Sequence, residues 1–331
     1  MNYLEKIKNL ESLNTTSIDL TATLRQFYST YSRAVESNGL KIENFEQVFD
    51  QFLNLIEIQL KNPYLFESFH EALRKPIDYY QFGIDFITPL IILEDSKVLN
   101  LNIVDEIEQH LKNGENVILL ANHQIEPDPQ AISILLEKTH PKLAEEMIFV
   151  AGHRVITDPL SVPFSLGRNL LCIYSKKHIS TPPEKTLKKQ QHNQRTMMRM
   201  KELLTIGGKC IYVAPSGGRD RLNSEGVIEI AKFDPQSIEM FSLMAKQSKK
   251  TTHFYPLALS TYNLLPPPHS IDKNLGEERH AKCAPVHLCF NQEIDMEHFP
   301  GSDGLDKKEK REKRAEYIWN IVLNDYQNFP S

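Results

Sequence analysis

The first part of the chain has a hydrophobic pattern typical of helices. Apolar side chains recur every three or four residues on one face of an amphipathic helix, at Phe45, Val48, Phe49, Phe52 and Ile56. Asn62-Pro63 should end this helix, and Asn38-Gly39 should separate it from the helix before. Because no strand pattern is found before Pro76, we predict a small helical domain over residues 1–80.

From about residue 82 the pattern changes to short apolar runs that alternate with helical segments. The predicted strands are Val117–Ala121, Met147–Ala151, Leu170–Tyr174, Cys210–Ala214, Phe254–Leu259 and Val286–Phe290. The predicted helices cover residues 103–112, 129–139, 185–206, 236–249 and 307–326. This alternation predicts an α/β fold over residues 81–331, with a mixed, largely buried sheet flanked by helices.

Composition excludes several classes of protein. With 40% hydrophobic residues, 24% charged residues and a net charge of -5, the chain resembles an ordinary globular protein rather than a nucleic-acid-binding one. No apolar run approaches the roughly 20 residues of a membrane-spanning helix. The N-terminal residues lack an apolar leader and include Glu5, Glu11 and Asp19, so we expect a cytoplasmic protein. The four cysteines have no CxxC spacing and are expected to be reduced, buried thiols.

Two loops that follow predicted strands carry the candidate chemistry. Residues 122–128 contain His123 and Asp128, a pair in which the carboxylate can orient the imidazole and stabilise its cation. Residues 215–221 contain a Gly-Gly turn, which can form an anion-binding nest, between Ser216 and two arginines that can hold phosphate oxygens. The alternatives are a surface histidine, an Asp128 that only caps the following helix, and a glycine turn with solvated arginines.

The His-x4-Asp spacing occurs three times, so the spacing alone does not identify a catalytic pair. The second pair, His153 with Asp158, also follows a strand and remains a competitor. The third, His298 with Asp303, lies in a loop region without a leading strand.

Two further groups of residues have open interpretations. Between Lys185 and Lys201 there are six Lys or Arg residues and no Asp or Glu, which fits either a solvated helix face or a docking surface for an acidic partner. Cys283, His287 and Cys289 could be metal ligands, but their alternation favours a strand and a fourth ligand is missing.

Several longer segments resemble one known family. Residues 122–129, Asn-His-Gln-x-Glu-x-Asp-Pro, look like the first block of the glycerolipid acyltransferases, in particular the soluble plastid-type glycerol-3-phosphate 1-acyltransferases. The other matching segments are Gly152–Leu160, Pro163–Leu170, Tyr174–His178, Ala214–Arg221 and Tyr255–Ser260. They follow the family's order over roughly residues 120–260, and the helical N-terminal region fits the family's two-domain layout.

The resemblance implies specific roles. His123 would be the catalytic base and Asp128 its partner, and the phosphate of the substrate would be surrounded by Lys177, His178, Arg219 and Arg221. The family more often has an acidic residue where His153 stands, which weakens the second pair as a rival.

The resemblance also implies a reaction. Residues 81–331 would form an acyltransferase catalytic domain that moves a fatty acyl group from acyl carrier protein or acyl-CoA to the sn-1 hydroxyl of glycerol 3-phosphate. The resemblance implies no metal, cofactor or nucleic acid. It implies transient contact with a membrane surface. The protein would be located in a bacterial cytoplasm or a plastid stroma. The alternatives are acylation of lysophosphatidate and a non-catalytic phosphate- or acyl-binding module.

Overall fold

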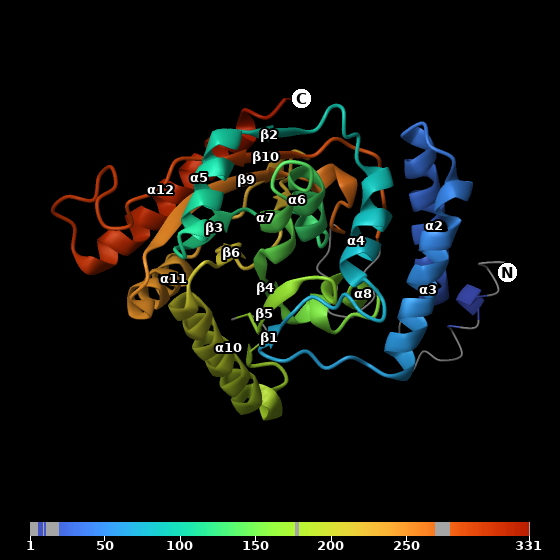
Figure 1. The fold of residues 1–331 in the computed structure, drawn as a ribbon, viewed down its shortest axis with the longest axis horizontal. Coiled ribbons are helices and arrows are strands. Elements are labelled where there is room, and N and C mark those ends of the chain that lie inside the picture. The colour runs from blue at the N-terminus through green and yellow to red at the C-terminus, as the bar shows by residue number, and fades with distance from the viewer. Residues whose placement is uncertain (1–5, 9, 11–19, 176–178, 269–278, 331) are drawn as a thin grey trace.

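The computed structural model describes residues 6–8, 10, 20–175, 179–268 and 279–330, arranged around one eight-stranded sheet (Figure 1). The order across this sheet is β1-β5-β4-β6-β3-β9-β10-β2. Its strands are β1 (Phe69–His70), β2 (Lys97–Leu99), β3 (Asn116–Ala121), β4 (Ile148–Gly152), β5 (Asn169–Ile173), β6 (Cys210–Val213), β9 (Thr252–Ser260) and β10 (His287–Phe290). β7 (Arg221–Leu222) and β8 (Ile228–Glu229) form a separate hairpin.

The sheet is mixed, and its five central strands are parallel. β5, β4, β6, β3 and β9 run in one direction, whereas β1 and the β10–β2 pair run in the other. All six residues of β3 are buried, which explains why this strand reads as a continuous apolar run. The carboxyl ends of the parallel strands meet at one edge, where ligand sites of such sheets form. The prediction of a mixed α/β fold is confirmed.

Helices cover both faces of the sheet. The longer helices are α2 (Leu20–Ser37), α3 (Glu46–Lys61), α4 (Tyr79–Ile87), α5 (Leu101–Lys112), α6 (Asp128–Leu136), α10 (Thr186–Ile206), α11 (Pro235–Ser248) and α12 (Lys307–Gln327). The short helices are α7 (Pro141–Glu146) and α8 (Val162–Ser165). Because successive side chains of a strand face opposite ways, α5, α6 and α7 pack with Val117 and Leu119 of β3, and α10, α11 and α12 with Ile118 and Leu120.

The N-terminal helices pack against the end of this layered structure. Figure 1 shows α2 and α3 side by side at one end of the molecule, with α4 between them and the sheet. Their apolar faces share one buried cluster with Ile125, Leu160 and Leu264. The boundary at residue 80 stays a prediction, since α4 runs from Tyr79 to Ile87 across it.

The helical prediction for residues 1–80 was wrong in one stretch. After α3 the chain is largely non-helical until α4, and it contains β1, which pairs antiparallel with β5. The expectation that no strand precedes Pro76 therefore fails, because a two-residue strand is too short to show alternation. In the part of the chain that the structure describes, no helix has the length and apolar character needed to cross a membrane.

Candidate active site

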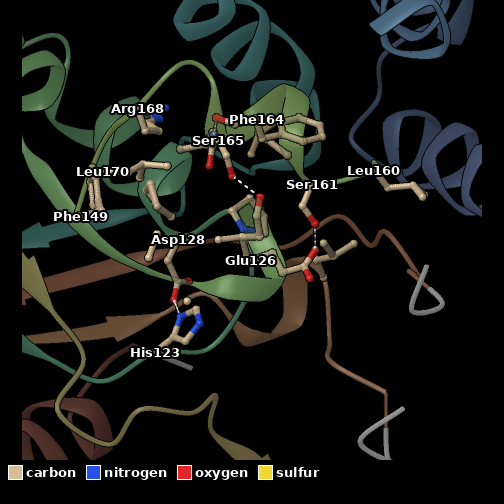
Figure 2. A pocket seen from close by; sticks show the side chains of 18 of the residues that line it. His123, Glu126, Asp128, Phe149, Leu160, Ser161, Phe164, Ser165, Arg168 and Leu170 are labelled. Carbon is tan, nitrogen blue, oxygen red and sulfur yellow. Dashed lines mark hydrogen bonds and ion pairs between the residues drawn. The ribbon is translucent and has the colours of Figure 1, made fainter. Parts of the chain in front are cut away.

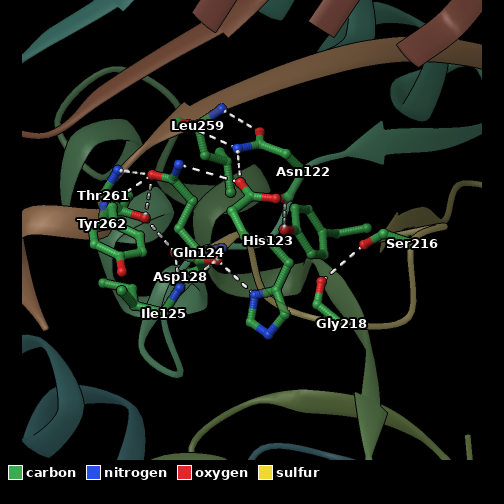
Figure 3. Close-up of polar contacts among 12 residues, drawn as sticks. Asn122, His123, Gln124, Ile125, Asp128, Ser216, Gly218, Leu259, Thr261 and Tyr262 are labelled. Carbon is green, nitrogen blue, oxygen red and sulfur yellow. Dashed lines mark hydrogen bonds and ion pairs between the residues drawn. The ribbon is translucent and has the colours of Figure 1, made fainter. Parts of the chain in front are cut away.

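His123 lies in the loop that leaves the carboxyl end of β3. Its Nδ1 atom is 2.7 Å from Oδ2 of Asp128, the first residue of α6 (Figure 3). An ionised carboxylate can only accept, so Nδ1 carries the proton and Nε2 is the ring nitrogen that can accept one. Figure 3 shows Nε2 pointing away from Asp128. The imidazole is 29% exposed and the Asp128 side chain 1%, so this is a buried carboxylate that holds a partly accessible histidine.

The Asp128 carboxylate accepts hydrogen bonds from two segments of the chain, the His123 loop and the residue that follows β9. Oδ2 also accepts a hydrogen bond from the backbone N–H of Gln124 at 2.8 Å, and the N–H of Ile125 lies 3.3 Å from both oxygens. Oδ1 accepts from the hydroxyl of Thr261, just beyond β9, at 2.6 Å. The alternative of a helix cap is not supported, because Pro127 is the N-cap residue and Asp128 is the first residue of the helix. The side chain instead organises the loop around His123.

Asn122 and Gln124 join the ends of β3 and β9. The Asn122 amide donates to the Leu259 carbonyl at 3.0 Å and accepts from the Leu259 N–H at 2.7 Å. Gln124 Oε1 accepts from the N–H groups of Thr261 and Tyr262 at 2.6 and 2.9 Å (Figure 3). Both side chains are fully buried, so these bonds fix the loop on each side of His123.

Asp220 connects the second loop to the first and was not singled out from the sequence. Its carboxylate accepts from Asn122 Nδ2 at 2.9 Å, from Gln124 Nε2 at 3.2 Å and from the Ala231 N–H at 2.9 Å. Its own N–H donates to the His123 carbonyl at 2.7 Å. Burial raises the pKa of Asp220 to about 6, although these hydrogen bonds lower it. The two loops are thus one hydrogen-bonded unit.

The glycine turn has only one residue that requires glycine for its backbone angle. Gly217 has a φ of +65° and donates to the Ala214 carbonyl at 3.1 Å. Gly218 does not have a positive φ, so only one of the two successive glycines adopts the backbone conformation that favours glycine. The Ser216 hydroxyl donates to the Gly218 carbonyl at 2.9 Å, which closes the turn (Figure 3).

Arg219 and Arg221 flank the buried Asp220. Because successive residues of an extended chain alternate, an inward Asp220 leaves the two half-buried arginines on the other side of the segment. Arg221 Nη1 donates to the Pro268 carbonyl at 2.6 Å. The positive charge of Arg219 is one of those that lower the pKa of the Glu126 carboxyl. This guanidinium therefore interacts electrostatically with the loop that carries His123.

The other two predicted phosphate ligands, Lys177 and His178, lie outside the described residues. The chain that leads to them is described as far as residue 175. At the end of β5, Tyr174 exchanges two hydrogen bonds of 2.8 Å with the side chain of Asn193 on α10. These bonds fix the direction in which the chain leaves the strand.

An apolar pocket opens beside His123 and Asp128 (Figure 2). It runs between the carboxyl ends of the strands and the N-terminal helices. Its apolar lining includes Phe27 of α2, Phe52 of α3, Phe86 of α4, Phe164 of α8, Val155, Leu160 and Leu264. The combination of a polar mouth and an apolar interior suits an amphiphilic molecule.

Arg279, a buried arginine, lines a polar part of this pocket. Arg279 donates to the Glu126 carboxylate through Nε at 2.9 Å, and through Nη2 to Asp158 at 3.1 Å and to the Ser161 hydroxyl at 2.9 Å. Burial alone would raise the pKa of Glu126, but Arg279, the strongest opposing charge, holds it well below its usual range. Sequence reasoning missed Arg279, which is more than 150 residues from Glu126 along the chain.

The two rival histidines lie in different surroundings. The His153 ring packs against Tyr174, with ring centroids 4.6 Å apart, while Asp158 accepts from the Arg279 guanidinium. His298 is 82% exposed, and its Nδ1 faces Asp295 at 3.1 Å rather than the expected Asp303. Of the three spacings, the His123 pair is the one whose imidazole and carboxylate are joined beside the pocket.

The hypothesis that Cys283, His287 and Cys289 bind a metal ion is not supported by the geometry. His287 and Cys289 are buried residues of β10, as the predicted strand requires. Among the residues that the structure describes, the groups able to hold a metal ion do not include them or Cys283.

Comparison with known proteins gives a consistent result. Residues 102–260 match a family model described as Acyltransferase. A chloroplastic glycerol-3-phosphate acyltransferase of Arabidopsis thaliana is 36% identical over 333 residues, which cover 98% of this chain and 72% of the relative. That of Spinacia oleracea is 39% identical, over 98% of this chain and 69% of the relative. That of Pisum sativum is 40% identical, over 84% and 62%.

Proposed function

Since this chain belongs to the glycerol-3-phosphate acyltransferase family of the chloroplast type, and is an enzyme of that activity, we propose that His123 is its catalytic base and Asp128 the partner that orients it. The observation that carries this proposal is the 2.7 Å contact between Nδ1 and a buried carboxylate at the mouth of an apolar pocket. The substrates are glycerol 3-phosphate and an acyl donor.

In the proposed reaction His123 Nε2 takes the proton of the sn-1 hydroxyl as its oxygen attacks the thioester carbonyl. The new C–O bond gives a tetrahedral oxyanion, which collapses with cleavage of the C–S bond. The imidazolium then returns the proton to the departing thiolate, so atoms and charges balance. Asp128 stabilises the transient positive charge of the ring and keeps the proton on Nδ1.

We propose that Arg219 and Arg221 bind the substrate phosphate, together with Lys177 and His178. A guanidinium carries five N–H donors in a fixed plane, so Arg221 can contact the Pro268 carbonyl and still reach a phosphate oxygen. Asp220, between the two arginines, bonds to the loop that carries His123. This link would set the distance from the phosphate group to the base.

The apolar pocket is proposed to hold the fatty acyl chain. Its aromatic lining is continuous, since the ring centroids of Phe52 and Phe86 are 5.1 Å apart and those of Phe86 and Phe164 are 5.2 Å apart. Burying each methylene group of an acyl chain gains about 0.8 kcal/mol. A thioester carbonyl at the mouth would then lie next to His123.

We favour acyl carrier protein over acyl-CoA as the donor because of the charge on α10. Lys188, Arg195 and Lys201 are exposed on this helix. Lys189 is buried, however, and Arg199 pairs with Glu202 at 2.9 Å, so these two add less to the surface charge. The exposed cations would attract an acidic carrier protein.

The proposed location is a plastid stroma or a bacterial cytoplasm, in keeping with relatives that are named as chloroplastic. The proposed product, 1-acyl-sn-glycerol 3-phosphate, is an amphiphile. Its delivery to a bilayer would require transient contact with a membrane surface.

The direct test uses radiolabelled glycerol 3-phosphate with palmitoyl or oleoyl donors. We expect labelled 1-acyl product from the wild-type protein, and a loss of about 10²–10⁴-fold in rate for His123→Ala. His298→Ala, a change at an exposed histidine, should retain the wild-type rate and is the matched control. Near-normal turnover by His123→Ala would refute the assignment of the base.

A further inference from the structure

Two histidines and three glutamates meet near the amino ends of the central strands, at the end of the sheet opposite His123. The group consists of Glu106 and His110 on α5, Glu115 in the turn before β3, His253 in β9 and Glu293 after β10. The six residues of β3 separate Glu115 from the loop of the active site. At about 3.3 Å per residue the two places are roughly 20 Å apart, so this group is not part of the acyltransferase site.

Two ring nitrogens converge on one carboxylate oxygen. His110 Nδ1 is 2.7 Å and His253 Nε2 is 3.3 Å from the same Oε2 atom of Glu115. The two imidazole rings are stacked, with centroids 3.6 Å apart and planes inclined by 24°. Ligand atoms of these three residues all lie within 4.8 Å of one another. Two imidazoles and a carboxylate around one point are typical ligands of zinc.

The second nitrogen of each histidine faces another carboxylate. His253 Nδ1 is 2.8 Å from Glu293 Oε1, and His110 Nε2 is 3.7 Å from Glu106 Oε1. The Glu106 carboxylate is itself held by the hydroxyl of Tyr255 at 2.7 Å. Histidines that bind a metal usually donate their other N–H to a carboxylate, which fixes the tautomer that coordinates. The His253–Glu293 contact has this geometry, whereas the His110–Glu106 contact is longer than a hydrogen bond.

We propose that His110, His253 and Glu115 bind a divalent transition-metal ion of the zinc type, with water as the fourth ligand. Zn–N and Zn–O bonds of about 2.0–2.2 Å in a tetrahedral site put ligand atoms roughly 3.4 Å apart. The 3.3 Å contact already has this spacing, and the 2.7 Å contact needs to open by less than about 1 Å. The carboxylates of Glu106 and Glu293 add negative charge that a dication neutralises.

This ion would join segments that are far apart in the chain. His110 lies in the last turn of α5, Glu115 precedes β3 and His253 lies in β9, so one ion would cross-link a helix to two neighbouring parallel strands. The other possible group, Glu106, His110 and Glu293, has a single imidazole and two exposed carboxylates, and is the weaker candidate. Because the ion binds only the folded state, it should stabilise the protein as its concentration rises.

The test is a titration of tag-free, chelator-treated full-length protein with ZnCl₂, followed by calorimetry and by competition with a chromophoric chelator. We expect one saturable ion per chain and a higher unfolding midpoint with excess zinc. His253→Gln and Glu115→Gln should each abolish binding of this ion, and circular dichroism should show that both variants are folded. The matched control His298→Gln, at an exposed histidine, should retain it.

Three results would overturn the proposal. They are no saturable binding to the wild-type protein, unchanged binding to folded His253→Gln and Glu115→Gln, or equal loss of binding in His298→Gln. Since the readout is metal binding and not acyl transfer, failure here leaves the proposed function intact.

Discussion

Replacing Asp128 with asparagine tests the proposed base sharply, because the structure predicts which way the new amide will face. The oxygen at the Oδ2 position must receive both His123 Nδ1–H and the N–H of Gln124. An NH₂ group there would oppose two donors. At the Oδ1 position an NH₂ group meets the Thr261 hydroxyl, which can turn to accept. The Ile125 N–H is 3.3 Å from both positions, so it does not favour either orientation of the amide. The amide oxygen should therefore face His123, and the imidazole should keep its tautomer.

The expected loss of activity is small for a residue at this position. A hydrogen bond to a charged group contributes about 1.5–3 kcal/mol and one between neutral groups about 0.5–1.5 kcal/mol. The change in the His123 contact thus costs about 1–1.5 kcal/mol, or roughly tenfold in kcat. An asparagine that forces the wrong tautomer in a Ser-His-Asp triad costs about 10⁴-fold. The two orientations of the amide therefore predict rates that differ by about three orders of magnitude.

The assay is steady-state acylation of glycerol 3-phosphate by Asp128→Asn, His123→Ala and the double variant. The double variant should be no slower than His123→Ala, because Asp128 is proposed to act through the ring. A 10⁴-fold loss in Asp128→Asn would refute the argument from the Gln124 amide. An additive loss in the double variant would refute the proposed coupling of the two residues.

Four other changes probe different parts of the site. Arg221→Ala should raise KM for glycerol 3-phosphate more than KM for the acyl donor, and equal effects in steady-state kinetics would contradict a phosphate contact. Val155→Phe, which adds bulk at a half-buried position in the pocket, should lower kcat/KM for a palmitoyl donor more than for an octanoyl donor. Burial raises the pKa of Asp220 to about 6 from 3.8, so the folded protein binds this proton more tightly than the unfolded chain, and stability is lost as pH rises through 6. Relative to Asp220→Asn, urea denaturation of the wild type should show about 2 kcal/mol more loss of stability between pH 4 and 7, and parallel pH profiles would contradict this. Charge reversal of Lys188 and Arg195 should slow acylation from acyl carrier protein but not from acyl-CoA, and equal effects on both donors would contradict the proposed docking surface.

The central fold could be predicted from the sequence because its strands are buried on both faces. β3 and β9 are continuous apolar runs and were found within two residues of their observed ends. β1, with two residues, and β2, with three, are too short to show any period. Such edge strands depend on a neighbouring strand that is distant in the sequence, so a local pattern does not reveal them.

The site could be predicted only where its members are close in the chain. His123 and Asp128 belong to one loop, and their spacing was visible. Asp220 and Thr261 reach that loop from the ends of other strands, which no local spacing records. One signal for Asp220 was available: between two arginines in an extended segment, it should face the opposite side, toward the protein interior.

The aromatic wall of the pocket comes from a different part of the chain than the reacting groups. Phe27, Phe52 and Phe86 belong to α2, α3 and α4, whereas His123 stands at the end of a central strand. Substitutions in the N-terminal helices can therefore change which chain lengths fit without moving the atoms that transfer the proton. Variants with new acyl preferences could arise, or be engineered, by altering these helices while the rate of the chemical step is retained.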